Sequence, residues 1–96
     1  MTLLTNEILT EALAHVPGWV YEDNAIWKEF VFKSFPDAIT TVNKIAIVAE
    51  EMNHHPEWTN VYNKLIIRLY THDSLGVTTK DIRLAHAIET ILREKA

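Results

Sequence analysis

The sequence contains no cysteine, which excludes disulfides, thiolate metal ligands and cysteine nucleophiles. It has only two glycines and three prolines, and it carries neither a glycine-rich phosphate loop nor a Gly-x-Ser-x-Gly nucleophile elbow. No apolar run approaches the roughly 20 residues that cross a bilayer. Positive charge is not in excess either. The formal net charge is -4, so the chain has no electrostatic reason to bind nucleic acid directly.

What remains is the composition of one ordinary globular domain over residues 1–96. Hydrophobic residues make up 48% of the chain, which is generous for a lone small domain with a modest core, and this favours a homo-oligomer. Residues 1–16 carry Glu7 and Glu11 but no lysine or arginine, unlike a secretory signal or a transit peptide. We therefore expect a cytoplasmic protein without a membrane association.

Hydrophobic periodicity and turn residues predict seven elements in the order α-β-β-α-β-β-α. In chain order they are a helix at about 5–16, strands at 19–22 and 26–32, a helix at 34–54, strands at 58–62 and 65–72, and a helix at 78–92. Turns are expected at Asp23-Asn24 and Asn63-Lys64. This order predicts an α+β fold, with a four-stranded antiparallel sheet and three helices packed on one face.

The predicted middle helix is unusually apolar. Its main stripe consists of Ile39, Val42, Ala46, Ala49 and Met52, widened by Ile45 and Val48, and Ile47 lies well off the centre of that stripe. A helix that is apolar over so much of its circumference is usually covered on more than one side. The sequence therefore predicts a subunit contact on this helix.

Two adjacent histidines, His54 and His55, stand at the predicted end of the middle helix, and His72 ends the predicted strand 65–72. Histidine is the side chain whose ordinary pKa lies nearest neutrality, so it suits proton transfer. Pro56 disfavours helical geometry at His55, so the two imidazoles should point in different directions. This clustering indicates a candidate site, which His72 completes if its strand lies alongside.

Two carboxylates are placed to assist these histidines. Glu50 precedes His54 by four residues, so on a helix the two share a face and the carboxylate can fix the imidazole tautomer. Asp81 occupies a capping-box position three residues after Thr78, near the start of the last helix, where it could orient an imidazole or hold a substrate group.

Each of these residues also has a purely structural interpretation. His54 suits a helix C-terminus, His55 a solvated loop, His72 a strand end and Asp81 a helix cap. Zinc held by three imidazoles is a further alternative, but the chain lacks the paired helical histidines of a His-Glu-x-x-His motif. The remaining histidines, His15 and His86, we interpret as structural.

The motif Glu50-x-x-x-His54-His55-Pro56-x-Trp58, followed by Asn60-Val61-Tyr62-Asn63-Lys64, Thr71-His72 and Asp81-Ile82, resembles the pterin-4a-carbinolamine dehydratase family. The resemblance extends from about Trp19 to the last helix. It implies dehydration of 4a-hydroxytetrahydrobiopterin to quinonoid dihydrobiopterin, which recycles the pterin cofactor of aromatic amino acid hydroxylases. It also implies that neither a metal nor an organic cofactor takes part.

The same resemblance assigns roles to individual residues. The implied catalytic residues are His54, His55 and His72, and the implied substrate-binding residues are Trp19, Glu50, Pro56 and Asp81. Trp19 and Asp81 would form pocket wall, and Glu50 would support the histidines. Loss of water from C4a needs one proton delivered to the hydroxyl and one removed from N5, which are jobs for groups that titrate near neutrality.

The family also implies a homo-oligomer, a tetramer built from dimers. In animals some members double as dimerisation cofactors of a homeodomain transcription factor. A non-enzymatic protein-interaction module is therefore the alternative function, and the apolar middle helix would supply its surface.

Overall fold

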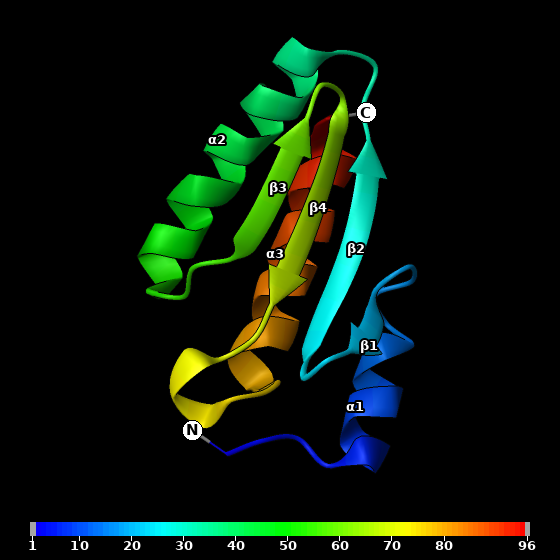
Figure 1. Cartoon of the computed structure of the whole chain (residues 1–96), viewed down its shortest axis with the longest axis vertical. Helices are drawn as coiled ribbons and strands as arrows, with labels where there is room; N and C mark the ends of the chain where they lie inside the picture. The colour runs from blue at the N-terminus through cyan, green and yellow to red at the C-terminus, as the bar shows by residue number, and fades with distance from the viewer. Residues whose placement is uncertain (1, 96) are drawn as a thin grey trace.

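The computed structural model describes residues 2–95 (Figure 1). Its elements are α1 (Asn6–Leu13), β1 (Val20–Glu22), β2 (Ala25–Val31), α2 (Phe35–Met52), β3 (Glu57–Val61), β4 (Lys64–Leu69), a short 3₁₀ helix η1 (His72–Ser74), and α3 (Thr79–Lys95). The strands form one antiparallel sheet in the order β1-β2-β4-β3. The predicted fold class and element order are confirmed. No helix in the described part of the chain is long and apolar enough to span a bilayer.

Strand alternation places the core on one face of this sheet. Leu65, Ile67 and Leu69 of β4 are buried, while the intervening Ile66 is 38% exposed. The buried residues of β4 meet Ile45 of α2 and the buried side chains of α3 in one hydrophobic cluster, which Leu9 of α1 joins. In Figure 1, α3 runs behind the central strands and α2 lies beside it.

Side-chain caps fix where the helices begin. The Thr5 hydroxyl accepts the Ile8 N–H at 3.2 Å, and the Ser34 hydroxyl accepts the Asp37 N–H at 3.2 Å, so both are N-caps. The first hairpin turns at Asp23 and Asn24, both with positive φ (51° and 63°), as a type I′ hairpin turn requires. These predicted boundaries are confirmed.

Two predicted elements are shorter than expected. The first helix ends at Leu13 rather than Val16, because the His15 and Val16 N–H groups bond to carbonyls three residues back, and Pro17 disfavours helical geometry at Val16. The strand predicted to reach His72 ends at Leu69, because β2 supplies its last partner there, in the pair Ile26–Leu69. His72 instead begins η1.

Two local predictions also need correction. The second hairpin turns at Tyr62 and Asn63 rather than at Asn63-Lys64, with Tyr62 at φ 53° and the Asn60 amide donating to the carbonyls of Tyr62 and Lys64. On α2 the buried residues are Ala38, Thr41, Ile45 and Ala49, so the buried face is rotated from the predicted stripe. Ala46, which the prediction placed in the stripe, is exposed.

Candidate active site

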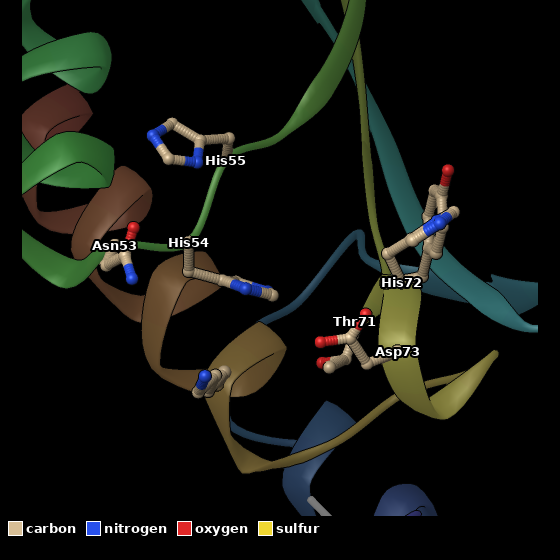
Figure 2. A pocket seen from close by; sticks show the side chains of 8 residues that line it. Asn53, His54, His55, Thr71, His72 and Asp73 are labelled. Atoms are coloured by element: carbon tan, nitrogen blue, oxygen red, sulfur yellow. The ribbon is translucent and has the colours of Figure 1, made fainter.

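The candidate site is an open cavity of about 310 Å³ between the end of α2 and the segment that follows β4 (Figure 2). It is lined by Asn53, His54, His55, Tyr70, Thr71, His72, Asp73 and Lys80. The sequence predicted that three histidines would meet, and the structure brings all three to this cavity. Its volume lies near the lower end of the range for small-molecule sites.

The end of α2 places His54. The helix ends at Met52, and Asn53 adopts the left-handed conformation (φ 51°) that often terminates helices. The His54 N–H then donates to the Ala49 carbonyl at 3.0 Å, which turns the chain back toward the helix. The His54 side chain therefore points inward, toward the Thr71–Asp73 side of the cavity, and His54 is only 8% exposed (Figure 2).

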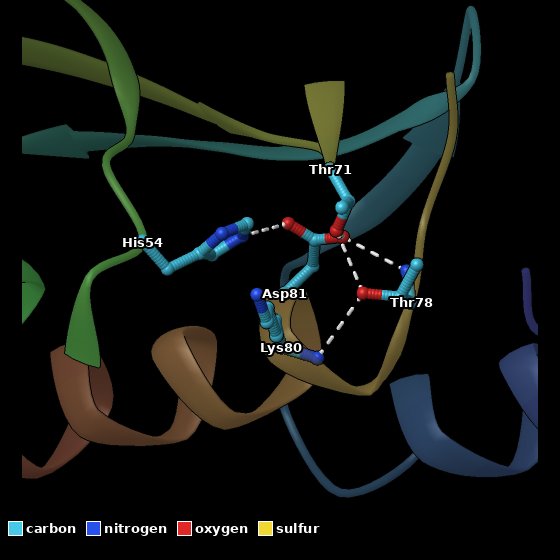
Figure 3. Close-up of polar contacts among 5 residues, drawn as sticks. All are labelled: His54, Thr71, Thr78, Lys80 and Asp81. Carbon is cyan, nitrogen blue, oxygen red and sulfur yellow. Dashed lines mark hydrogen bonds and ion pairs between the residues drawn. The ribbon is translucent and has the colours of Figure 1, made fainter. Parts of the chain in front are cut away.

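A fully buried carboxylate holds the His54 imidazole (Figure 3). Asp81 Oδ1 lies 2.6 Å from His54 Nε2, while Oδ2 accepts the Thr71 hydroxyl at 2.9 Å and the Thr78 N–H at 2.8 Å. Burying a charged carboxylate is costly unless donors satisfy it, and here three groups do so. An ionised Asp81 fixes the proton of His54 on Nε2 and leaves Nδ1 available to a ligand.

The hydroxyls behind Asp81 have a defined direction. Thr71 uses its single proton on Asp81, so in the 2.6 Å contact between the two threonine hydroxyls Thr78 must be the donor. The Thr78 oxygen in turn accepts the Lys80 N–H at 3.3 Å. The hydroxyl and backbone donors of this network thus point toward Asp81. Asp81 thus caps α3 and contacts an imidazole, but it does not line the cavity, so the substrate-binding role that the resemblance implies for it stays a prediction.

The spacing predicted that Glu50 would pair with His54, and this prediction is wrong. Glu50 Oε1 lies 2.8 Å from Nε2 of His55 instead. The physical reason is that α2 ends before His54, so the i,i+4 relation of a continuous helix is lost. Figure 2 shows the His55 ring directed away from the His54 ring. Both side chains of this pair are largely exposed (59% and 80%), so it contributes little to stability.

The other predicted residues lie at different distances from the cavity. His72 lines it from η1 and is exposed to solvent. Trp19 does not line it: this tryptophan is 4% exposed, and its Nε1–H donates to Glu89 Oε2 at 2.9 Å. Pro56 is half-buried and does not line it either. Their roles in substrate binding stay predictions of the resemblance.

Sequence reasoning gave no role to several residues that line the cavity, namely Asn53, Tyr70, Thr71, Asp73 and Lys80. Thr71 and Lys80 flank His72 and Asp81 in sequence, and that adjacency was the only available signal. Tyr70 and Asp73 are brought in because the chain leaves the sheet after Leu69. No group of three His, Asp or Glu side chains in residues 2–95 is arranged to hold a metal ion.

Comparison with known proteins assigns the chain to one family. Residues 2–91 match the family model described as pterin 4 alpha carbinolamine dehydratase. A protein of Prochlorococcus marinus strain MIT 9515, provisionally named pterin-4-alpha-carbinolamine dehydratase, is 45% identical over 92 residues, covering 96% of each chain. A provisionally named dehydratase of Christiangramia forsetii is also 45% identical over 92 residues, covering 96% of this chain and 95% of its own.

Comparison with solved structures agrees with the family match. A crystal structure described as a transcriptional coactivator/pterin dehydratase from Brucella melitensis superposes with a TM-score of 0.91 at 39% identity, covering 94% of this chain and 98% of that one. A pterin dehydratase-like RuBisCO assembly factor of the alpha-carboxysome shares the fold, with a TM-score of 0.63 at 16% identity over 76% of this chain and 84% of its own. The chain belongs to the pterin 4 alpha carbinolamine dehydratase family.

Proposed function

We propose that this protein dehydrates 4a-hydroxytetrahydrobiopterin to quinonoid dihydrobiopterin and water, and so recycles the pterin cofactor of an aromatic amino acid hydroxylase. The observation that carries the proposal is the meeting of His54, His55 and His72 on one cavity, with His54 oriented by the buried Asp81. Membership of the family supplies the substrate class. Histidine acid–base catalysis supplies the mechanism.

The reaction needs two proton transfers. The C4a–O bond breaks as the departing hydroxyl receives a proton, and loss of the N5 proton allows the C4a=N5 double bond to form. We assign the two transfers to His54 and His72, which line the cavity from opposite segments. His54 would act through Nδ1, because Asp81 occupies the Nε2 side. His55, held by Glu50 at the rim, would mainly bind the pterin.

The direct test generates the 4a-carbinolamine with a phenylalanine hydroxylase and follows formation of the quinonoid dihydropterin. We expect the wild-type protein to accelerate this step and the His54→Ala/His55→Ala double variant to lose the acceleration. A single His54→Gln variant is sharper, because the glutamine amide can still donate to Asp81 while being unable to transfer a proton. His86→Ala, which changes an exposed histidine on α3, is the matched control.

These assays separate catalysis from a histidine-independent effect. A positioned acid or base contributes about 10²–10⁴-fold, so His54→Gln should lose a rate of that order while His86→Ala loses none. A folded wild-type protein that gives no acceleration would contradict the proposed activity. Full activity of His54→Gln, with normal substrate affinity, would contradict the assignment of His54.

An interaction function has its own supporting observation. Ile47 projects from α2 with 63% of its surface exposed, and it lies on the side of the helix opposite the buried Ile45 and Ala49. We propose that this face pairs subunits of a homo-oligomer, a dimer or tetramer, and that it is the surface which a transcription-factor partner would use. The Brucella melitensis relative, described as a transcriptional coactivator, supports keeping this second candidate.

The Ile47→Glu variant tests the interaction surface, with Ile8→Glu as the matched control. Both isoleucines are exposed in the single chain (63% and 53%), but only Ile47 lies on α2. We expect Ile47→Glu to lower the mass measured by light scattering, and Ile8→Glu to leave it unchanged. Equal masses for all three proteins would contradict the proposed contact. An interaction role should survive alanine at His54 and His55, whereas the dehydratase should not.

A further inference from the structure

Three side chains form a continuous stack that ends at the candidate site. Arg68, Tyr70 and His72 occupy alternate positions at the end of β4 and the start of η1. The Arg68 guanidinium carbon lies 5.0 Å from the centroid of the Tyr70 ring. The Tyr70 and His72 ring centroids are 6.5 Å apart, with the planes inclined at 53°. Tyr70 therefore contacts the cation and the imidazole through its ring.

The far end of this stack is anchored in the sheet. Arg68 pairs with Trp27 of β2 and Glu57 of β3, so its backbone lies on the central strand. Its Nη2 donates to the Asp23 carbonyl at 2.8 Å, and its Nη1 lies 3.5 Å from Glu57 Oε1. A guanidinium held on two sides is a fixed platform for an aromatic ring.

The near end of the stack lacks comparable support. Within residues 2–95, the ring nitrogens of His72 make no hydrogen bond or ion pair, whereas His54 is held by Asp81 and His55 by Glu50. His72 is exposed and begins a 3₁₀ helix of only three residues. Its imidazole has two rotatable bonds, so several rotamers compete unless a neighbour restricts them. The Tyr70 ring is the aromatic neighbour in place to do so.

Tyr70 also lines two hollows. One is the histidine cavity, and the other is an open hollow of about 250 Å³ lined by Asp23, Asn24, Arg68, Tyr70 and Leu75. Because Tyr70 borders both, its removal would leave open space beside His72 into which the imidazole could turn. The Tyr70 ring, rather than its hydroxyl, makes both contacts, and the contact with the His72 ring is tilted rather than parallel.

We propose that Tyr70, held in place by Arg68, is the positioning residue that fixes the His72 imidazole in the cavity. The kinetic consequence of this inference rests on the proposed dehydratase function. The contact between Tyr70 and His72 does not depend on that function. It predicts that an aromatic ring is needed at position 70 and that the phenolic hydroxyl is dispensable.

The experiment compares Tyr70→Ala, Tyr70→Phe and the matched control Tyr62→Ala, which removes a tyrosine exposed in the β3–β4 turn. Dehydration kinetics give kcat and KM separately. Nuclear magnetic resonance of the His72 imidazole, assigned with His72→Gln, reports on ring packing without any substrate. We expect Tyr70→Ala to lower kcat by about tenfold, part of what a positioned acid or base supplies, with little change in KM.

The kinetics and the His72 resonance together distinguish failure of this inference from failure of the proposed function. We expect the His72 resonance to move toward the value of a free histidine in Tyr70→Ala, and to stay near the wild-type value in Tyr70→Phe and Tyr62→Ala. An unmoved resonance in Tyr70→Ala overturns the inference even if the enzyme is active. A rise in KM alone also overturns it, because Tyr70 would then be a binding contact. If the wild-type protein is inactive, the proposed function fails. The His72 resonance then still shows whether the Tyr70 ring restrains the imidazole.

Discussion

Replacing Asp81 by asparagine should reverse the tautomer of His54. Asp81 Oδ2 accepts from two donors, the Thr71 hydroxyl and the Thr78 N–H. In Asp81→Asn, only the amide oxygen can occupy that position without placing donors against donors. The amide NH₂ must then face His54 Nε2, where Oδ1 now lies at 2.6 Å. Nε2 becomes the acceptor, and the proton moves to Nδ1.

The rate loss follows from this exchange. For Nδ1 to take a proton, or for the imidazolium to form, Nε2–H would have to face the asparagine NH₂. That arrangement leaves a buried donor unsatisfied, which costs about 1–3 kcal/mol. At 1.36 kcal/mol for each factor of ten, this is about 5- to 150-fold in rate. Loss of the carboxylate charge that stabilises the imidazolium adds to it, so we expect kcat to fall by about 100-fold or more. Replacing the aspartate beside the catalytic histidine of serine proteases by asparagine lowers kcat by about 10⁴-fold.

The assay is the coupled dehydration measurement, with Asp23→Asn as the control. Asp23 lies in the exposed β1–β2 turn, and its backbone carbonyl, rather than its side chain, accepts from Arg68. Both variants should be checked for folding by circular dichroism, since Asp81→Asn weakens three buried hydrogen bonds. A folded Asp81→Asn protein with kcat within twofold of wild type would refute the tautomer argument.

Two further predictions test the surroundings of the site. Thr71→Val removes a buried hydroxyl that donates to Asp81 and accepts from Thr78. The free energy of unfolding should therefore fall by about 2 kcal/mol and Tm by about 10 °C. The control Thr59→Val, on the exposed face of β3, should change neither value much. Glu89→Gln weakens an acceptor shared by the Trp19 indole (2.9 Å) and the Lys28 ammonium (2.8 Å), so thermal unfolding should show a loss of about 1 kcal/mol. Dehydration kinetics of Glu89→Gln should stay at the wild-type values, and a raised KM would instead connect this cluster to the pterin site.

The fold could be predicted from the sequence because its signals are local. Thr5 and Ser34 are followed by apolar residues at helical spacing, and Asp23-Asn24 is a turn pair that tolerates positive φ. Each signal depends on a few neighbouring residues, so no knowledge of packing is needed to interpret it. The errors fall where a specific side-chain contact or a left-handed residue overrides average propensity. Tyr62 takes a left-handed conformation because Asn60 holds the turn, and no propensity scale favours tyrosine there.

The sequence could predict which histidines meet at the cavity, but neither most of the other lining residues nor the carboxylate that each histidine contacts. The three histidines could be grouped from their motif, yet Glu50 contacts His55 rather than the predicted His54, and His54 contacts Asp81 instead. Glu50 meets His55 because Asn53 ends α2 with a left-handed residue one position before His54. A single residue of left-handed backbone redirects every side chain that follows it. Periodicity arguments assume a continuous helix, so they cannot predict contacts across such a termination.

The position of Asp81 couples the stability of the fold to the chemistry of the site. The same carboxylate caps the N-terminus of α3 through the Thr78 N–H and orients His54 from the end of α2. Thr71, just beyond β4, supplies the third contact. The Asp81 carboxylate thus joins the end of α2, the segment after β4 and the start of α3. Its three hydrogen bonds can form together only when all three segments are in place. A variant that loosens this junction should lose activity at a lower temperature than it loses secondary structure, because orientation of the imidazole tolerates less movement than helix capping does.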